Sequence, residues 1–326
     1  MPYIKNLFEQ FSKTKVLVLG DIMLDHYLSG DVDRISPEAP VPVVVAKDEY
    51  YRLGGAGNVA LNLKALGLSP LICAVAGKDS AAGQLQEVLK AEAISADYLL
   101  YSEKRPTTVK TRVLSKSQQL LRIDSENSAD LEAGEENALL DKIRDIFEQN
   151  KPEILILQDY DKGVLTKHVI ESVTEMALKQ GTFIAVDPKF RHFFNFEYAD
   201  LFKPNLAELR KAFSMESLSV KQLDEYCLPL LKQQKHKNLM VTLSEKGIYW
   251  NNGKSGQQFP AKVRNIADVS GAGDTVIAVA ALALYHGLSD KDICRLSNLA
   301  GGIVCESLGV VPVDPRKLVD EWQHND

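Results

Sequence analysis

The sequence predicts an α/β protein with a doubly wound, mostly parallel sheet and a small β-sheet lid. Short apolar runs alternate with longer amphipathic segments along most of the 326 residues, which is the pattern of strands covered by helices on both faces. Residues 24–52 and 105–124 interrupt this alternation and have the pattern of strands in a separate sheet. We therefore expect one domain over residues 1–326, with the lid formed by these two insertions.

The core elements can be placed in order along the chain. The first apolar run, residues 15–21, ends in Gly20-Asp21, which is typical of a buried strand whose carboxyl end meets a ligand. Further strands are expected at residues 71–77, 154–158, 183–187, 239–243 and 247–250. Helices are expected at residues 58–67, 81–93, 135–149 and 167–180, and from Asp274 and Lys291 onward.

The two insertions differ from the core in their residue pattern. Residues 24–52 include Val41-Pro42-Val43-Val44-Val45, which is too β-branched and too rich in proline for a helix. Within the insertion at 105–124, residues 107–124 alternate polar and apolar side chains, which indicates a half-exposed strand. A small sheet that cannot bury both faces by itself would cover the active site, meet a partner subunit, or do both. We expect a homodimer formed through this lid.

The composition argues against several classes of partner. The chain is 45% hydrophobic and 25% charged, which is ordinary for a globular protein. A formal net charge of −6 argues against a nucleic-acid partner held by bulk electrostatics, although a local basic pocket can still bind an anionic substrate. No apolar run has the length of a membrane span and the first 15 residues lack a signal-peptide core, so we expect a cytoplasmic protein without a membrane partner. Buried thiols are expected for the cysteines, which show no metal-ligand spacing: Cys73, Cys227, Cys294 and Cys305.

Residues 268–275, Asp-Val-Ser-Gly-Ala-Gly-Asp-Thr, carry the clearest chemical signal. Gly271, Ala272 and Gly273 allow close backbone approach, and the exposed N–H groups at the start of the following helix form an anion site. Asp274 lies on the first turn of that helix, where it could take a proton from a hydroxyl while the loop neutralises a phosphoryl group in transfer. The alternative is an N-capping aspartate after a flexible turn.

A second glycine-rich turn, residues 54–58, follows the first insertion. Gly54 and Gly55 would let a polyhydroxyl substrate approach the backbone, and Asn58 offers a donor and an acceptor to sugar hydroxyls. Asp21, at the end of the first strand, faces the same crevice in a doubly wound sheet and could accept hydrogen bonds from vicinal hydroxyls. A flexible turn that leads into a helix is the alternative interpretation.

An amide and a carboxylate lie one helical turn apart at Asn205 and Glu208. Oxygen groups at this spacing suit an Mg²⁺ ion that keeps most of its waters and bridges nucleotide phosphates. A capping box is the alternative, and both interpretations can hold together. The residues assigned to ATP in this turn are Asn205, Leu206, Ala207 and Glu208. Further nucleotide candidates are Thr242, Ser244 and Gly247, which an ordinary hairpin turn explains equally well, and Asn298 on the last helix.

Cationic residues gather in the two insertions although the chain is acidic overall. Lys110 and Arg112 alternate along one expected strand, so their side chains fall on one face and could converge on a phosphate. Solvated cations on an exposed strand face are the alternative. We expect a phosphorylated substrate, and the residues assigned to it are Arg34, Lys110, Arg112, Arg122 and Lys189, with Gln119 for hydroxyl contacts.

The glycine pair ahead of Asn58, the Asn-x-x-Glu pattern and the Gly-Ala-Gly-Asp pattern occur in this order, and together they resemble the ribokinase-type, or PfkB, carbohydrate kinases. The resemblance runs from about residue 15 to the C-terminal region. It implies a ribokinase-like fold and phosphoryl transfer from ATP with Mg²⁺. In this scheme Asp274 is the general base, and the N–H groups of residues 271–274 hold the developing negative charge.

A narrower likeness is to the heptose-7-phosphate kinases of lipopolysaccharide precursor synthesis. It is carried by residues 20–25, 34–42, 108–113, 118–124, 159–163 and 187–189. It implies transfer of the ATP γ-phosphoryl group to O1 of D-glycero-β-D-manno-heptose 7-phosphate, and it adds Asp187 to the substrate-binding residues. Some members carry a nucleotidyltransferase half with a Gly-x-x-His-x-Gly-His motif. The sequence has no such histidine pair, so we expect the kinase step alone from these residues.

Two other functions stay open. One is a kinase of the same fold for a different sugar or a nucleoside, and the other is a non-catalytic sensor of sugar phosphates. An intact Asp274 and Asn-x-x-Glu pattern weigh against the sensor. The cationic cluster weighs against ribose or a nucleoside, which has no phosphate to hold.

Overall fold

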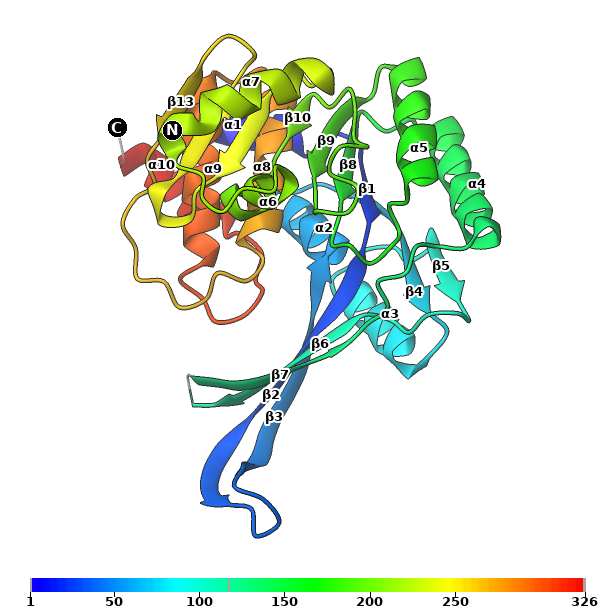
Figure 1. The fold of residues 1–326 in the computed structure, drawn as a ribbon, viewed down its shortest axis with the longest axis vertical. Helices are drawn as coiled ribbons and strands as arrows, with labels where there is room; N and C mark the ends of the chain where they lie inside the picture. Colours follow the sequence, from blue (N-terminus) through cyan, green and yellow to red (C-terminus); the bar gives the residue numbers. More distant parts are fainter. Residues whose placement is uncertain (1, 117, 325–326) are drawn as a thin grey trace.

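The structure is a computed structural model in which residues 2–116 and 118–324 are described. These residues form a sheet of nine strands with helices on both faces, and a sheet of four strands that projects from it (Figure 1). The strand order of the large sheet is β13-β12-β11-β10-β9-β8-β1-β4-β5. Neighbouring strands from β11 to β5 are parallel, and β12 and β13 pair antiparallel at one edge. The predicted fold class is confirmed.

The elements of the large domain have the following bounds. Its strands are β1 (Val16–Gly20), β4 (Leu71–Gly77), β5 (Leu99–Ser102), β8 (Ile154–Gln158), β9 (Phe183–Asp187), β10 (Leu201–Phe202), β11 (Leu239–Thr242), β12 (Ile248–Asn251) and β13 (Gly256–Phe259). The helices are α1 (Pro2–Phe11), α2 (Ala56–Ala65), α3 (Ser80–Ala91), α4 (Ala133–Gln149), α5 (Lys167–Gln180), α6 (Leu206–Ala212), α7 (Leu223–Gln233), α8 (Ala272–Tyr285), α9 (Asp290–Val304) and α10 (Pro315–His324).

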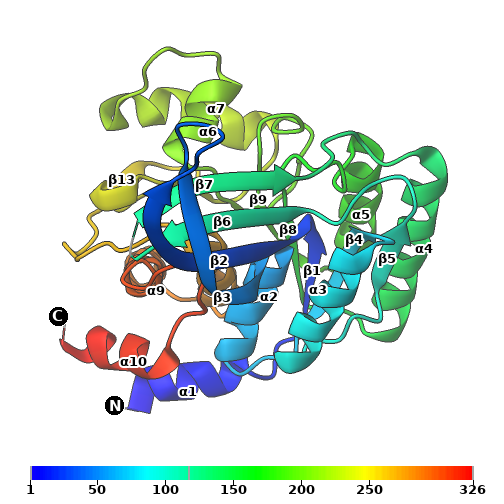
Figure 2. The ribbon, with the colours of Figure 1, turned by 90° about the horizontal axis from the view of Figure 1, so that it is seen from below.

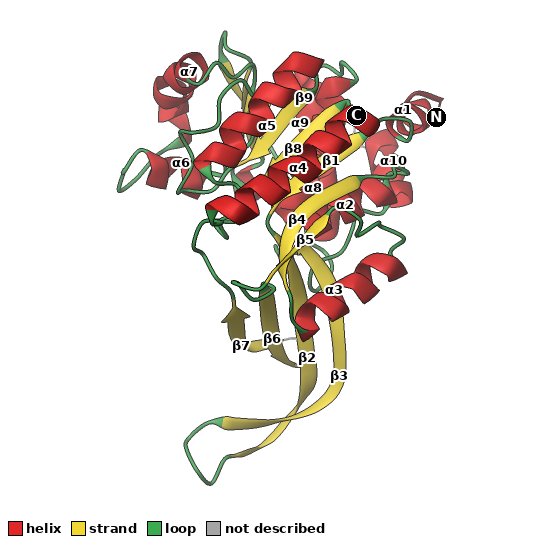
Figure 3. Cartoon of the chain, turned by 90° about the vertical axis from the view of Figure 1, so that its right-hand side faces the viewer, coloured by secondary structure: helices red, strands yellow, loops and turns green. Residues whose placement is uncertain are grey.

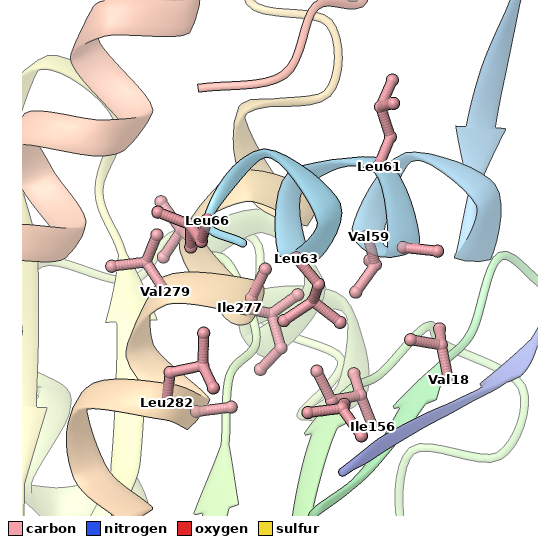
Figure 4. Close-up of a cluster of buried hydrophobic side chains, with 14 of the residues drawn as sticks. Val18, Val59, Leu61, Leu63, Leu66, Ile156, Ile277, Val279 and Leu282 are labelled. Atoms are coloured by element: carbon pink, nitrogen blue, oxygen red, sulfur yellow. The ribbon is translucent and has the colours of Figure 1, made fainter. Parts of the chain in front are cut away.

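Alternation along the strands sorts the core into two layers. Val16 and Val18 of β1 pack with α2, α3, α8 and α9, whereas Leu17 and Leu19 pack with α4 and α5 on the opposite face. Figure 3 shows α4 and α5 in front of the sheet, with α2 and α8 behind it. Side chains of α2 and α8 gather over β1 and β8 in the layer that contains Val18 (Figure 4). The strands are buried on both faces, which explains their continuous apolar runs.

The two insertions pair into one sheet, as the sequence predicts. Its strands are β2 (Ile22–Ile35), β3 (Pro42–Gly55), β6 (Val109–Ser115) and β7 (Gln118–Ser125), in the order β3-β2-β6-β7. β2 pairs antiparallel with β3 and parallel with β6, and the β2–β3 hairpin extends farthest from the large domain (Figure 1). Seen from below, the four strands lie in front of the large sheet (Figure 2).

The register of this small sheet sorts its side chains by character, because residues directly opposite one another share a face. One face, called here the inner face, carries Asp25, Tyr27, Lys110, Arg112, Arg122 and Asp124. The other, called the outer face, carries His26, Leu28, Thr111, Val113, Leu121 and Ile123. The inner face is therefore charged and the outer face largely apolar.

Two simpler expectations can be compared directly with the structure. All four cysteines are buried free thiols, as predicted, and burial raises the pKa of Cys73 to about 12. Among residues 2–116 and 118–324, every helix falls short of the length and apolar character that a membrane crossing requires.

Candidate active site

The carboxyl ends of three neighbouring strands, β1, β8 and β9, meet beside the N-terminus of α8. Gly20 of β1 is opposite Gln158 of β8, and Gln158 is opposite Asp187 of β9. The chain runs from β1 to β4 on one side and returns to β8 on the other, so the strand order reverses between β1 and β8. An open α/β sheet has its ligand crevice at such a point.

The glycine turn before α8 has the geometry of an anion site. Gly271 has a φ of 79°, and a Cβ atom there would lie 2.6 Å from Nδ2 of Asn58, so both the backbone angle and the space require glycine. The N–H groups of Gly273 and Asp274 have no hydrogen-bond partner in the described chain. Free N–H groups at a helix start attract anions, as the sequence predicts for this turn.

Asp274 is 2% exposed and receives hydrogen bonds from three side chains. Asn58 Nδ2 donates to Oδ2 at 2.8 Å, while the Tyr160 hydroxyl and Gln158 Nε2 donate to Oδ1 at 2.8 and 3.1 Å. Burial raises the pKa of Asp274 to about 7, and the nearby charge of Asp187 adds to this, although the bonds from Asn58 and Tyr160 oppose it. A carboxyl group that titrates near neutral pH beside an anion site suits a general base.

Asn58 is positioned by Asn62, one turn farther along α2. Asn62 Nδ2 donates to the main-chain oxygen of Asn58 at 2.9 Å, and Asn62 Oδ1 accepts from the Thr275 hydroxyl at 3.0 Å. This network joins α2 to α8 and directs the Asn58 amide to Asp274. Asn58 is fully buried, so its amide faces the base rather than an open crevice, in contrast to the sugar contact expected from the sequence.

Asp21 also differs from the expectation. Its carboxylate accepts hydrogen bonds from the main-chain N–H groups of Tyr160, Lys162 and Val164 at 2.7, 3.0 and 3.2 Å. It is 1% exposed, and both oxygens are engaged, so it is not placed to receive sugar hydroxyls. Asp21 instead shapes the loop after β8 that brings Tyr160 to the base.

Asp25, four residues farther along the chain, lies where the small sheet joins the large domain. It is 3% exposed and forms an ion pair with Arg112. A Cβ atom on Gly54 would lie 2.3 Å from Asp25 Oδ2, so the predicted glycine pair leaves room for this carboxylate. Burial raises the pKa of Asp25, and Arg112 opposes that shift. Asp25 is not among the residues expected from the sequence. An acidic residue within an apolar strand is nevertheless a pattern that indicates a functional side chain.

The lysine and arginine predicted to share a strand face do so, and each has an acidic partner. Arg112 pairs with Asp25, while Lys110 Nζ lies 3.3 Å from Asp124 and 3.1 Å from Glu126. Lys162, which was not expected, reaches the same Glu126 at 2.8 Å. Two lysines and one arginine therefore gather at the inner face of the small sheet.

The remaining predicted substrate residues are not brought to this cluster. Arg122 lies opposite Arg112 but is half exposed and bonds to Asp124, and Gln119 is exposed on β7. Arg34 is exposed nine residues beyond Asp25 on β2, which corresponds to about 30 Å of extended strand. Alternation places side chains on a face but does not show how far along the strand they lie.

Comparison with known proteins agrees with this geometry. Residues 13–316 match the model of the pfkB family carbohydrate kinases. The chain belongs to this family. A carbohydrate kinase is a phosphotransferase, so the predicted enzyme class is confirmed.

Relatives and solved structures agree with the family. The chain is 39% identical over 312 residues to the bifunctional protein HldE of Methylobacillus flagellatus and 36% identical over 322 residues to that of Citrifermentans bemidjiense. These matches cover 94% and 98% of this chain but only 63% and 66% of the relatives, so the chain spans about two thirds of their length. The fold resembles Escherichia coli phosphofructokinase-2 in complex with potassium, with a TM-score of 0.78, 19% identity and coverage of 95% and 99% of the two chains. It also resembles Arabidopsis thaliana ribokinase complexed with ribose and ATP, with a TM-score of 0.71, 19% identity and coverage of 94% and 98%. The predicted ribokinase-like fold is confirmed.

In this pfkB-family chain, the Asn-x-x-Glu pattern forms a capping box at the start of α6. Asn205 Oδ1 accepts from the Glu208 N–H, and Glu208 Oε2 accepts from the Asn205 N–H, both at 2.8 Å. Glu208 also pairs with Lys189, whose ammonium lies 5.1 Å from the centre of the Tyr160 ring. Lys189 therefore belongs to this side of the crevice and not to the cations of the small sheet. Leu206 and Ala207 form the intervening first turn.

The oxygen ligands available at the start of α6 fit a hydrated Mg²⁺ ion. Glu208 and Asp187 supply carboxylates, and the negative charge of each raises the pKa of Lys189. No group of three or more His, Cys, Asp or Glu side chains able to hold a metal occurs among the described residues. Mg²⁺ often keeps several waters and uses one or two carboxylates with substrate phosphates, so this set is sufficient.

The other nucleotide candidates surround the β11–β12 hairpin of the kinase. Thr242 bridges to Asn205, which joins the hairpin to the capping box. Ser244 and Gly247 form the turn, as the hairpin alternative requires, and Gly247 has a φ of 89°. The Asn298 amide donates to two main-chain oxygens, those of Phe259 and Pro260, at 3.1 and 3.3 Å. The adjoining loop exposes the side chains of Val263 and Ile266, which were not expected.

The base of the small sheet is tied to the loop after α9. Arg52 Nη1 donates to two carbonyl groups within residues 308–310 at 3.1 and 2.8 Å, and the Tyr27 hydroxyl accepts an N–H from the same segment at 3.0 Å. Asp268 accepts a further hydrogen bond from an N–H group of this loop at 3.0 Å and one from the Ser270 N–H at 2.9 Å. The small sheet, this loop and the glycine turn of the kinase therefore form one connected unit.

Proposed function

We propose that this chain transfers the γ-phosphoryl group of ATP to O1 of D-glycero-β-D-manno-heptose 7-phosphate, giving the 1,7-bisphosphate for lipopolysaccharide precursor synthesis. The observation that carries the proposal is the buried Asp274 at the anion-binding start of α8. Family membership supports the kinase reaction, and the likeness of residues 34–42, 108–113 and 118–124 to heptose-7-phosphate kinases supports the substrate. The use of ATP places the reaction in the cytoplasm.

Asp274 acts as the base of this reaction. It takes the proton of the O1 hydroxyl as that oxygen attacks the γ-phosphorus, and the bond from phosphorus to the β,γ-bridging oxygen breaks to release ADP. The free N–H groups of Gly273 and Asp274 donate hydrogen bonds to the phosphoryl oxygens on which negative charge develops. One such donor contributes about 3 kcal/mol to transition-state stabilisation in comparable sites.

The inner face of the small sheet holds the sugar phosphate. Lys110, Lys162 and Arg112 supply the charge for the 7-phosphate, and Asp25 accepts hydrogen bonds from sugar hydroxyls in place of Asp21. Glu126 bridges the two lysines, so phosphate binding requires these lysines to exchange that carboxylate for the phosphate. The exchange gives selectivity, because an uncharged sugar cannot replace a carboxylate.

The nucleotide lies against α6 and the β11–β12 hairpin. Its phosphates approach Asn205 and Glu208, and its base packs against the exposed apolar side chains of Val263 and Ile266. Glu208, with Asn205 beside it, would hold a hydrated Mg²⁺ ion. When bound, this ion would neutralise negative charge on the ATP phosphates.

The small sheet acts as a lid and as a dimer contact. Its outer face exposes Leu121 and Ile123 by 55% and 53%, and both are on the edge strand β7. A second copy of the chain covers this apolar face, which a monomer would leave in water. Closing the lid over the sugar excludes water, which otherwise competes as the phosphoryl acceptor.

The proposal is tested by coupled ADP-release assays with phosphorylated and unphosphorylated sugars and nucleosides. We expect ADP with heptose 7-phosphate, and a product that carries a second phosphate ester at C1 by phosphorus NMR. Rapid ADP release with a different sugar or with a nucleoside would replace the substrate but keep the kinase. Tight binding of a sugar phosphate without any ADP would instead support the sensor.

A further inference from the structure

We propose that Lys203 is a further catalytic residue, whose ammonium group donates hydrogen bonds to the phosphoryl group in transfer while Asp187 holds it in place. The inference rests on the proposed kinase reaction with ATP as donor. It does not depend on which sugar accepts the phosphoryl group.

Lys203 follows β10 directly, at the carboxyl edge of the large sheet. Its main-chain N–H donates to the oxygen of Val186 at 2.8 Å, which places it beside the end of β9. The side chain is 3% exposed, and Nζ lies 3.0 Å from Asp187 Oδ1. Lysine is almost never buried to this extent without a partner or a function.

The ammonium group reaches the anion-binding turn of α8. A Cβ atom added to Gly273 would lie 3.7 Å from Lys203 Nζ and 3.9 Å from Asp187 Oδ2. Both charged groups therefore pack against the second residue of the helix, whose N–H is free. In the described part of the chain Asp187 is the single partner of this ammonium, so two of its three N–H groups lack an acceptor.

Asp187 links Lys203 to the base through Gln158. Gln158 Nε2 donates to Asp187 Oδ2 and to Asp274 Oδ1, both at 3.1 Å. Two carboxylates face this nitrogen, so they fix the orientation of the amide. Its oxygen is buried without a hydrogen-bond partner among the described residues, which a purely structural bridge would avoid. The base, the ammonium group and the free N–H of Gly273 are thus connected through Gln158 and Asp187.

The chemistry of transfer explains this arrangement. The acceptor oxygen forms a bond to phosphorus, the bond to the bridging oxygen of ADP breaks, and the proton of the acceptor goes to Asp274. Lys203 donates charge-assisted hydrogen bonds to non-bridging oxygens of the phosphoryl group. Asp187 is a positioning residue for this ammonium group, in addition to its place among the carboxylates that suit Mg²⁺.

The test compares Lys203→Met with the wild type and with Lys237→Met. Lys237 is a matched control, because it is 74% exposed and pairs with Asp200 away from the site. For Lys203→Met we expect kcat to fall by about 100-fold, which is the loss seen when one preorganised donor is removed. ADP affinity should stay within about twofold, while affinity for β,γ-methylene-ATP falls by about tenfold, since only the latter carries a γ-phosphoryl group. Lys203→Arg should recover part of kcat.

The proposal is overturned if Lys203→Met keeps the kcat and the ratio of the two nucleotide affinities of the wild type. Should that variant not fold because Asp187 is left as an unpaired buried charge, the double variant Asp187→Asn, Lys203→Met removes both charges and takes the same test. A different pattern separates the two hypotheses. If the wild type makes no ADP with any sugar, the proposed function is contradicted. If Lys203→Met nevertheless loses the preference for β,γ-methylene-ATP over ADP, the contact between Lys203 and the γ-phosphoryl group is supported.

Discussion

The Asn58 amide donates a hydrogen bond of 2.8 Å to Oδ2 of Asp274, across the interface between α2 and α8. This bond stabilises the ionised carboxylate, so it opposes the rise in pKa that burial causes. The strength of the base therefore depends on a helix that precedes it by more than two hundred residues.

The first prediction concerns pH. Asp274 must be ionised to act, so kcat/KM of the wild type should fall with unit slope as the pH drops below about 7. In Asn58→Leu the carboxylate loses a donor, its pKa rises, and the acid limb should move up by about one pH unit. The pH dependence of kcat/KM for both enzymes measures this. An acid limb at the same pH in both would show that Asp274 does not govern the profile.

The second prediction concerns the base itself. Asp274→Asn keeps the shape of the side chain and removes its charge, so the variant should fold and bind ATP. Its kcat should fall by about 10²–10⁴-fold, the range of general base catalysis. Circular dichroism, ATP titration and ADP release together check this outcome. Near-normal turnover would reject the assignment of the base.

The third prediction concerns the sugar phosphate. Lys110→Met should raise KM for the phosphorylated sugar by about tenfold or more and leave kcat nearly unchanged, because a remote charge contributes binding. Lys78→Met is the control, since Lys78 is an exposed lysine in an ion pair with Glu103 outside the small sheet. Steady-state kinetics on both variants decide the matter. An equal effect of the two substitutions would argue against a phosphate site at Lys110.

The fourth prediction concerns acid stability. His236 is buried, stacks on Phe202 at 4.4 Å, and its pKa is lowered by burial to about 3. Between about pH 6.5 and 3 the unfolded chain binds a proton that the folded chain does not. Stability from this residue is thus intact above pH 6.5 and is lost at up to about 1.4 kcal/mol per pH unit as the pH falls through that window.

A matched pair of variants tests this claim. His236→Phe should show a shallower fall of Tm with acid than the wild type, whereas His324→Gln, at an exposed histidine of α10, should not. Identical slopes in all three proteins would place the acid sensitivity elsewhere.

The fifth prediction concerns assembly. Leu121→Lys combined with Ile123→Lys places two charges on the outer face of the small sheet and should convert a dimer into monomers. Leu178→Lys is the control, because Leu178 is 48% exposed on α5. Sedimentation equilibrium gives the masses. A wild type that sediments as a monomer would contradict the dimer.

Elements that are encoded by a run of neighbouring residues can be predicted from the sequence. The strands β1, β8 and β9 are continuous apolar runs, so they and the site at their carboxyl ends could be predicted. The strand β10 is only two residues long, too short for any period, and α7 contains Pro229, which interrupts a helical pattern. The sequence pattern therefore does not predict either element.

The residues of the site likewise fall into those that could be predicted from the sequence and those that could not. Asp274 could be placed because the chemistry of a helix start is set by neighbouring residues. The orientation of Asp21 could not, because its partners are N–H groups more than 130 residues away. Gln158 and Lys203 are unremarkable in the sequence, and only strand pairing brings them to the base.

The bonds that tie Arg52 and Tyr27 to residues 308–310 have a mechanical consequence. Any swing of the hairpin must carry that loop with it or break the bonds, and Asp268 bonds both to that loop and to Ser270, directly ahead of the glycine turn. With the hairpin swung outward and no sugar bound, the glycine turn that binds the phosphoryl group would therefore be less firmly held. The same movement that opens the site to the sugar would then slow the hydrolysis of ATP in the absence of sugar.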